Sequence, residues 1–256
     1  MGNGNAQSRT FTKGIWKSVM LVPASRLALL QVVPLVSYTG AYPTAPLTDA
    51  AAAPFSILVV AHFWAAAPGA ATLTVTTQWG ATATARVAFR AGENAVNATV
   101  TAAPATGEVS LWWPGGHGAH PLYSVTAALL ADGSSAPAVN ASRTIGFRAL
   151  YLVTADDSDP SVLAGVDGSG NATMRFKVNG ADIYARGGNI IPMEELEGRL
   201  SAVAYDRMVQ SAADAHFNLF RVWGGGIYPP EAFFDAADRN GILIYEDVMF
   251  GSDACT

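Results

Sequence analysis

The chain has 256 residues, a net charge of −5 and only 14% charged residues. This length allows one or two domains with a sizeable core, and an acidic balance without a basic block argues against nucleic acid as a partner. The single cysteine, Cys255, excludes an intrachain disulfide.

The first residues, 1–9, are polar and lack the basic region and apolar run of a signal peptide. The apolar run 19–36 is short, and Pro23, Arg26 and Pro34 interrupt it. A charged side chain near the middle of a membrane span is costly. We therefore predict a strand here and no membrane partner.

The part of the chain up to Arg148 is predicted to be all-β. Leu73 and Val75 alternate with threonines, and 123–129 repeats this period of two. Glycine-containing turn signals such as Pro68-Gly69 recur between such runs. Short strands at this spacing are typical of a two-sheet sandwich.

After residue 170 the pattern changes from strands alone to alternating strands and helices. A strand at 174–178 precedes the hairpin dipeptide Asn179-Gly180, which favours a type I′ turn, and a second strand is predicted at 182–186. Ser201 is predicted to cap a helix that reaches Ala215. The face of this helix that we expect to be buried carries Ala204, Met208, Ala212 and Ala215.

A strand at 218–222, a helix between Pro229-Pro230 and Asn240-Gly241, and a strand at 242–245 complete the alternation. Such units form parallel sheets with right-handed crossovers. The predicted fold is therefore multidomain, β then α/β: a sandwich followed by the first part of a (β/α)8 TIM barrel, whose complete form needs eight strands.

One of these strands ends in a distinctive group of residues. Arg221 and Trp223 precede the triplet Gly224-Gly225-Gly226. An arginine can hold a carboxylate through two hydrogen bonds, and a tryptophan can stack on a sugar ring, so the group suggests carbohydrate chemistry. A simple turn after a strand, with the tryptophan in the core, remains the alternative.

Several motifs in order resemble those of the β-mannosidases of glycoside hydrolase family 2. They are GIWK at 14–17, WWPGGHG at 112–118, IGFR at 145–148, VNG at 178–180, RGGNIIP at 186–192 and RVWGGGIY at 221–228. The resemblance implies three parts: the tail of a sugar-binding β-domain at 1–22, an immunoglobulin-like sandwich at 23–149, and a truncated catalytic barrel at 150–256.

The resemblance implies a retaining glycoside hydrolase that releases terminal non-reducing β-D-mannose from oligosaccharides or glycoproteins, without a cofactor. It implies that Trp223 lines the mannose subsite, that Arg221 pairs with the nucleophile, and that Asn189 braces the pocket. Asp247, which ends a barrel strand, either lines the site or serves as a structural hydrogen-bond partner. The catalytic glutamates of the family lie beyond position 256, so the chain alone is expected to be inactive.

The remaining groups are expected to be structural. Carboxylates Glu194, Glu195, Glu197, Glu231, Asp235 and Asp238 are interpreted as solvated surface and helix-start charges, Trp112 as part of the sandwich, and the histidines as lacking metal-ligand spacing. Two alternatives remain: a sibling activity, such as an endo-β-mannosidase or exo-β-glucosaminidase, and a non-catalytic carbohydrate-binding remnant. Kinship and sequons at Asn97, Asn140 and Asn171 favour a lysosomal or secreted protein. The sequence does not indicate an oligomeric state.

Overall fold

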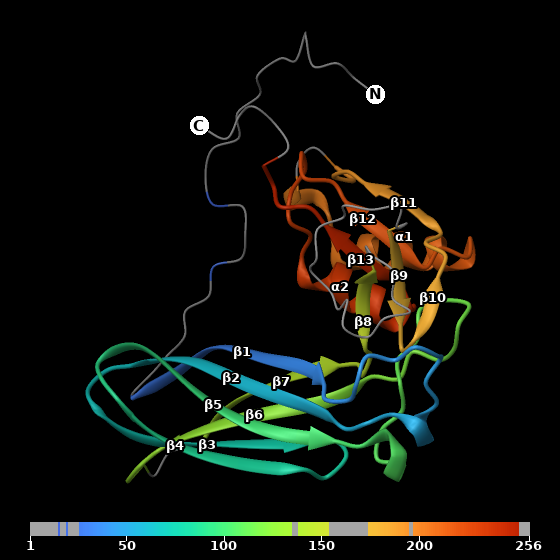
Figure 1. The fold of residues 1–256 in the computed structure, drawn as a ribbon. Coiled ribbons are helices and arrows are strands. Elements are labelled where there is room, and N and C mark those ends of the chain that lie inside the picture. Colours follow the sequence, from blue (N-terminus) through green and yellow to red (C-terminus); the bar gives the residue numbers. More distant parts are fainter. Residues whose placement is uncertain are drawn as a thin grey trace.

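The computed structural model describes residues 15, 19, 26–134, 138–153, 174–194 and 197–250. The expected domain tail at 1–22, apart from two isolated residues, lies outside this part of the chain, as do Asn171, Glu195 and Cys255. A β-sandwich forms the first unit of the molecule, and a smaller second unit of short strands and two helices lies against one end of it (Figure 1).

The sandwich consists of two antiparallel sheets. The first has the order β1 (Leu27–Tyr38), β2 (Phe55–Ala65), β5 (Gly92–Ala102). The second has the order β4 (Thr82–Phe89), β3 (Gly69–Thr77), β6 (Tyr123–Ala131), β7 (Val139–Ile145), and short 3-10 turns lie at Asp49–Ala51 and Pro104–Thr106. The expected all-β first part of the chain is confirmed.

The sandwich core follows the alternation of the strands. Phe55, Phe63, Leu73 and Val75 are fully buried between the sheets, while the threonines between them lie nearer the solvent. The apolar run near the amino end forms the edge strand β1, which pairs with β2 along its length. In the described part of the chain, no helix has the length and apolar character that crossing a membrane requires.

The second unit contains two small sheets. The antiparallel one has the order β10 (Ala181–Ile183), β9 (Arg175–Val178), β8 (Leu150–Val153). The parallel one has the order β11 (Gly187–Ile190), β12 (Leu219–Val222), β13 (Leu243–Glu246), with helices α1 (Ala202–Asp214) and α2 (Glu231–Arg239) as crossovers and a 3-10 turn at Glu197–Arg199. Asn179 and Gly180 both have positive φ, 49° and 79°, so the predicted type I′ hairpin is confirmed.

The predicted strand at 182–186 is wrong in its position. That strand ends at Ile183 and pairs antiparallel with β9, whereas the parallel strand is built from the glycines that were expected to end it. A Cβ on Gly187 would lie 1.7 Å from the carbonyl oxygen of Leu219. Glycine is therefore present because the neighbouring backbone is too close for any side chain.

The two helices are confirmed, and the predicted face of α1 is correct at Ala212, which is buried, and at Met208, which packs against the core. Tyr205, Val209 and Ala212 are buried, whereas Ala215 is exposed. The larger side chains face the core because they remove more apolar area from water than alanines do. Helix α2 follows Pro230 and ends at Asn240, before Gly241 with φ of 68°, as the sequence predicts.

Trp112 joins the two units, which corrects its expected place inside the sandwich. Its side chain is fully buried against Val178, Ile183 and Leu243 of the second unit. Its indole N–H donates to the backbone oxygen of Asp238, at 2.9 Å. The indole contacts the second unit because its polar edge finds a hydrogen-bond acceptor there.

Two fully buried asparagines hold the backbone around this junction. Asn179 Oδ1 accepts from Ala149 N at 2.8 Å, and its Nδ2 donates to Trp112 O at 3.0 Å. Asn218 Oδ1 accepts from Arg186 N at 2.8 Å, and its Nδ2 donates to Tyr184 O at 3.1 Å. Each amide therefore replaces a missing backbone partner at a place where strand pairing stops.

Candidate functional site

The candidate site lies at the carboxyl ends of the three parallel strands. Arg221, near the end of β12, has Asn189 of β11 and Tyr245 of β13 as its Cα partners in the neighbouring strands. Parallel strands in register bring their final residues to one edge of the sheet. Side chains that are far apart in sequence, such as those of Asn189 and Arg221, therefore meet there.

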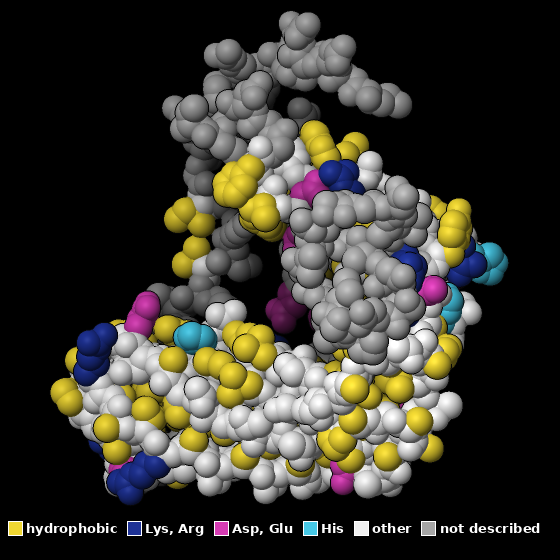
Figure 2. Space-filling view, viewed as in Figure 1, with side chains coloured by type: hydrophobic (Ala, Val, Ile, Leu, Met, Phe, Trp, Pro, Cys, Tyr) yellow, Lys and Arg dark blue, Asp and Glu magenta, His cyan; other side chains and the backbone are white. Residues whose placement is uncertain are grey.

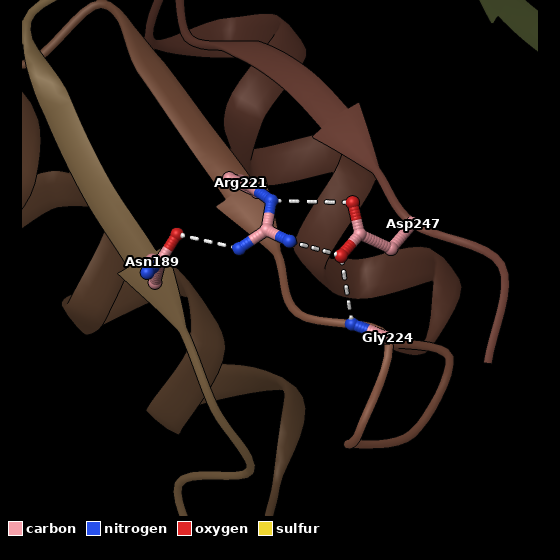
Figure 3. A network of polar contacts seen from close by, with 4 residues as sticks. All are labelled: Asn189, Arg221, Gly224 and Asp247. Carbon is pink, nitrogen blue, oxygen red and sulfur yellow. Dashed lines mark hydrogen bonds and ion pairs between the residues drawn. The ribbon is translucent and has the colours of Figure 1, made fainter. Parts of the chain in front are cut away.

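The Arg221 guanidinium is held by two neighbours (Figure 3). Its Nε donates to Asp247 Oδ1 at 3.2 Å, and its Nη2 donates to Asp247 Oδ2 at 2.5 Å. Its Nη1 donates to Asn189 Oδ1 at 3.2 Å. The two-pronged carboxylate contact fixes the plane of the guanidinium. Of its five N–H donors, three are used by partners in the described part of the chain, and two remain for a further acceptor.

Asp247 is itself fixed by the glycine loop. Its Oδ2 accepts from Gly224 N at 3.1 Å, and its backbone N–H donates to Val222 O at 3.1 Å. A Cβ on Gly224 would lie 2.7 Å from Val248 O and 2.9 Å from Asp247 Cβ. The first glycine of the triplet thus lets the loop approach the carboxylate closely. In the described residues Asp247 accepts hydrogen bonds from Arg221 and from the Gly224 backbone.

Trp223 stands beside this network and is 40% exposed. Its backbone N–H donates to Ile190 O at 3.0 Å. A Cβ on Gly225 would lie 2.3 Å from the indole, so the ring packs over that glycine. Together with Ile190, Pro192 and other apolar residues, Trp223 lines a small pocket of about 20 Å³. The ring is therefore held by its loop while part of its surface faces solvent.

The ion pair at the site is partly accessible to solvent. The side chains of Arg221 and Asp247 are 36% and 23% exposed. Such a pair contributes modestly to stability because water screens it. Its bidentate geometry instead orients a cation at the edge of the sheet.

The other carboxylates fall into two groups. Glu194 lies 3.8 Å from Arg199, and Glu231 and Asp235 are exposed on α2, as expected for surface groups. Asp238 corrects the expectation, because it is half-buried beside the sandwich. Burial raises its pKa, Arg148 opposes this shift, Asp235 adds to it, and Arg239 opposes it.

Arg148, which was not predicted to be a functional residue, faces Asp238 across a cavity that both residues line. Its guanidinium carbon lies 4.5 Å from the centre of the Trp112 ring. Burial lowers the pKa of Arg148, and the charge of Asp238 opposes this shift. Its position at the end of the IGFR motif, 145–148, was the one sequence signal that could have indicated a functional role. In the residues that the structure describes, no three His, Cys, Asp or Glu side chains gather as metal ligands.

No family model matches the chain. Among curated proteins it is 33% identical to the β-mannosidase of Rattus norvegicus and 37% identical to β-mannosidase A of Aspergillus terreus, in each case over 144 residues. These alignments cover 56% of this chain and 15% of each relative. The chain therefore matches a small part of the length of these relatives.

Two solved structures share its fold. The β-D-mannosidase of Dictyoglomus thermophilum matches 88% of this chain and 25% of its own, with a TM-score of 0.67 and 22% identity. The exo-chitosanase of Amycolatopsis orientalis matches 86% and 22%, with a TM-score of 0.63 and 21% identity. In sequence the chain is therefore similar to part of these β-mannosidases, and in fold to part of the β-D-mannosidase of Dictyoglomus thermophilum.

Proposed function

We propose that this chain is part of a retaining exo-β-mannosidase that releases terminal non-reducing β-D-mannose from oligosaccharides or glycoproteins. The observation that carries the proposal is the Arg221 guanidinium, held at the strand ends beside the half-exposed indole of Trp223. A cation with two remaining donors next to an aromatic surface suits a hydroxyl-rich ring and an acidic catalytic group. The names of the curated relatives, which are β-mannosidases, support mannose rather than another sugar as the proposed substrate.

Each site residue has a proposed role. Trp223 stacks on the terminal mannose. Arg221 donates its remaining hydrogen bonds to a catalytic carboxylate and keeps that group ionised by its positive charge. Asn189 and Asp247 keep the guanidinium oriented, since both already accept its hydrogen bonds.

The domain division is part of the proposal. Residues 1–22 are the end of a sugar-binding β-domain, 23–149 form an immunoglobulin-like sandwich, and 150–256 begin a (β/α)8 catalytic barrel. The parallel order β11-β12-β13 with helical crossovers supports the barrel assignment. Within the described residues β11 and β13 are the outer strands of this sheet, and further barrel strands would pair with them.

Hydrolysis with retention needs two carboxyl groups about 5 Å apart. Among the described residues at the strand ends, Asp247 is engaged by Arg221 and Gly224, and Glu246 is exposed. Neither is a suitable partner of a catalytic pair. We therefore assign both catalytic groups to later barrel strands and expect these 256 residues alone to lack activity.

A chromogenic aryl β-mannoside tests the assignment of roles. The chain should give no turnover above buffer, and measurable turnover would contradict the assignment of both catalytic carboxylates elsewhere. Extending the reading frame beyond codon 256 should reveal an Asn-Glu motif and restore activity. An extended product that cleaves only a glucosaminide favours the sibling activity, and an in-frame stop favours the carbohydrate-binding remnant.

A second test concerns binding at the site. Saturation-transfer NMR with methyl β-D-mannoside should show a signal of which Trp223→Ala removes a part. Trp64→Ala is the matched control, because Trp64 of the sandwich is 39% exposed, compared with 40% for Trp223. Equal loss of signal in both variants would contradict a specific role for Trp223.

The lysosomal or secreted location also remains a proposal. Of the three sequons, Asn97 and Asn140 are exposed on strands of the sandwich, where a glycan could be attached without disturbing the core. Mass spectrometry of the protein from a secretory host, before and after glycan removal, tests this. An unmodified mass would count against the secretory route.

A further inference from the structure

A second cavity lies between the sandwich and helix α2. It is lined by the end of β1, the end of β7, the segment leading into β8, and Asp238 of α2, and has a volume of about 730 Å³. Figure 2 shows the molecule hollowed between the sandwich and the α/β unit. Cavities of roughly 300–1,000 Å³ are the usual size of small-molecule sites.

Arg148 supplies unused hydrogen-bond donors to this cavity. Its guanidinium stacks on the Trp112 ring, 4.5 Å from the ring centre, which fixes its position from one side. In the described part of the chain it donates no hydrogen bond to a protein acceptor, although an arginine has five N–H donors. None of its nitrogens is buried without a partner, so the donors face the open space of the cavity.

Asp238 supplies the complementary acceptors. It comes from α2, and Trp112 holds its backbone through the indole N–H at 2.9 Å. Its carboxyl group accepts no hydrogen bond from a described residue, and it lies close enough to Arg148 for each to shift the pKa of the other. A cation and a carboxyl group that share one cavity make it neutral overall.

Two tyrosines add an aromatic wall. Tyr38 and Tyr151 both line the cavity. Tyr151 is held by Tyr42, whose ring centre lies 4.8 Å away at 76°, and Tyr38 by Phe55, at 5.2 Å. Burial raises the pKa of Tyr151, and the neighbouring Tyr38 adds to the shift, so the Tyr151 hydroxyl keeps its proton near pH 7 and can donate or accept.

We propose that this cavity is a binding site for a neutral polyhydroxylated molecule of about one sugar ring. Adjacent hydroxyls of such a ring accept from the Arg148 fork and donate to Asp238. Its apolar face lies against the tyrosines. A neutral ligand satisfies both groups without adding an unpaired charge to a half-buried space, whereas an anion would be repelled by Asp238. The proposal does not depend on the chemistry at the strand ends.

The test uses the unmodified 256-residue chain and three probes: methyl β-D-mannoside, glucose and acetate. Titration followed by NMR should show saturable binding of at least one sugar. Tryptophan fluorescence should report the same binding, because Trp112 contacts Arg148. Acetate should not bind. Saturation by acetate alone would replace the proposal with an anion site, and no saturation by either sugar would overturn it.

Variants locate the site. Arg148→Met keeps an unbranched side chain on Trp112 without the donors and should weaken sugar binding at least tenfold. Asp238→Asn should also weaken sugar binding, but by a smaller factor. Arg143→Met is the matched control, since Arg143 lies on the neighbouring strand β7 and, among the described residues, donates its side-chain hydrogen bond to a backbone oxygen. Binding should survive Trp223→Ala, which separates this site from the proposed mannose site. Unchanged affinity in Arg148→Met, with a native melting curve, would overturn the proposal.

Discussion

Replacing Asn179 should destabilise the protein more than its small size suggests. The side chain is fully buried, and its two hydrogen bonds connect the backbone of Ala149 with that of Trp112. Asn179→Ala leaves one buried donor and one buried acceptor unpaired, at about 1–3 kcal/mol each. Alanine also lacks the tolerance of asparagine for the left-handed backbone at φ of 49°, which costs about 1 kcal/mol more. The expected loss is about 3–7 kcal/mol, a large part of a typical free energy of unfolding of about 5–15 kcal/mol.

Urea unfolding followed by tryptophan fluorescence measures this loss as a lower midpoint. Asn179→Gly separates the two contributions, because it removes the same hydrogen bonds but tolerates the positive φ. It should be the more stable of the two variants by roughly 0.5–1 kcal/mol. Equal stability of both variants would mean that the backbone contribution is absent.

Asn94→Ala is the control for burial. Asn94 makes three hydrogen bonds with Arg90 and Gly92 in an accessible turn of the sandwich. Water can replace the lost partners there, so the variant should lose only about 1 kcal/mol. If Asn94→Ala is as unstable as Asn179→Ala, the number of hydrogen bonds decides the loss, and the reasoning from burial is refuted.

Gly187→Ala should prevent stable pairing of β11 with β12, because the new methyl would lie 1.7 Å from a backbone oxygen. Gly188→Ala, whose new methyl would lie 3.8 Å from its nearest neighbour, should change the thermal midpoint little. Equal thermal midpoints of the two variants would contradict this reasoning. Asp238→Asn should stabilise the protein near pH 7. Burial raises the pKa of Asp238, so its contribution to stability is fully present below the unfolded value of about 3.9 and is lost as pH rises through the folded value. Melting curves between about pH 3.5 and 8 should show the gain of the variant disappearing at the acid end. Asp247→Ala should cost about 1–2 kcal/mol in urea unfolding, because it frees the Arg221 guanidinium and the Gly224 N–H, and no loss would mean that the ion pair is not maintained in solution.

Local patterns explain what could be predicted from the sequence. The alternation around Leu73 predicts a half-buried strand, because neighbouring side chains point to opposite faces. The Asn179-Gly180 dipeptide predicts its turn because both residues tolerate positive φ. Arg221 and Asn189 could be placed at one edge because parallel strands align their ends, and the structure brings them within hydrogen-bond distance.

Other features could not be predicted because they depend on close approach in three dimensions. Gly187 and Gly188 look like the end of a strand, and only the position of the Leu219 carbonyl explains why a strand begins there. The buried face of α1 depends on which side chains reach α2, such as Tyr205, whose ring lies 6.4 Å from that of Phe233. Alanines at helical spacing indicate that a helix has a small apolar face, but they do not decide which side chains of the helix are buried.

The junction between the two units shows the same limit most clearly. Trp112 and Asp238 are 126 residues apart in sequence, and each has an ordinary local explanation, as a sandwich tryptophan and a helix carboxylate. Once the indole N–H binds the backbone of Asp238, however, the ring becomes the surface on which Arg148 lies. The position of the guanidinium then follows from the indole, and that of the carboxyl group from the same hydrogen bond. One buried side chain therefore sets the geometry of both charged groups. A Trp112→Phe variant keeps a ring but lacks the donor, so it should weaken sugar binding in this cavity although Arg148 and Asp238 are both present.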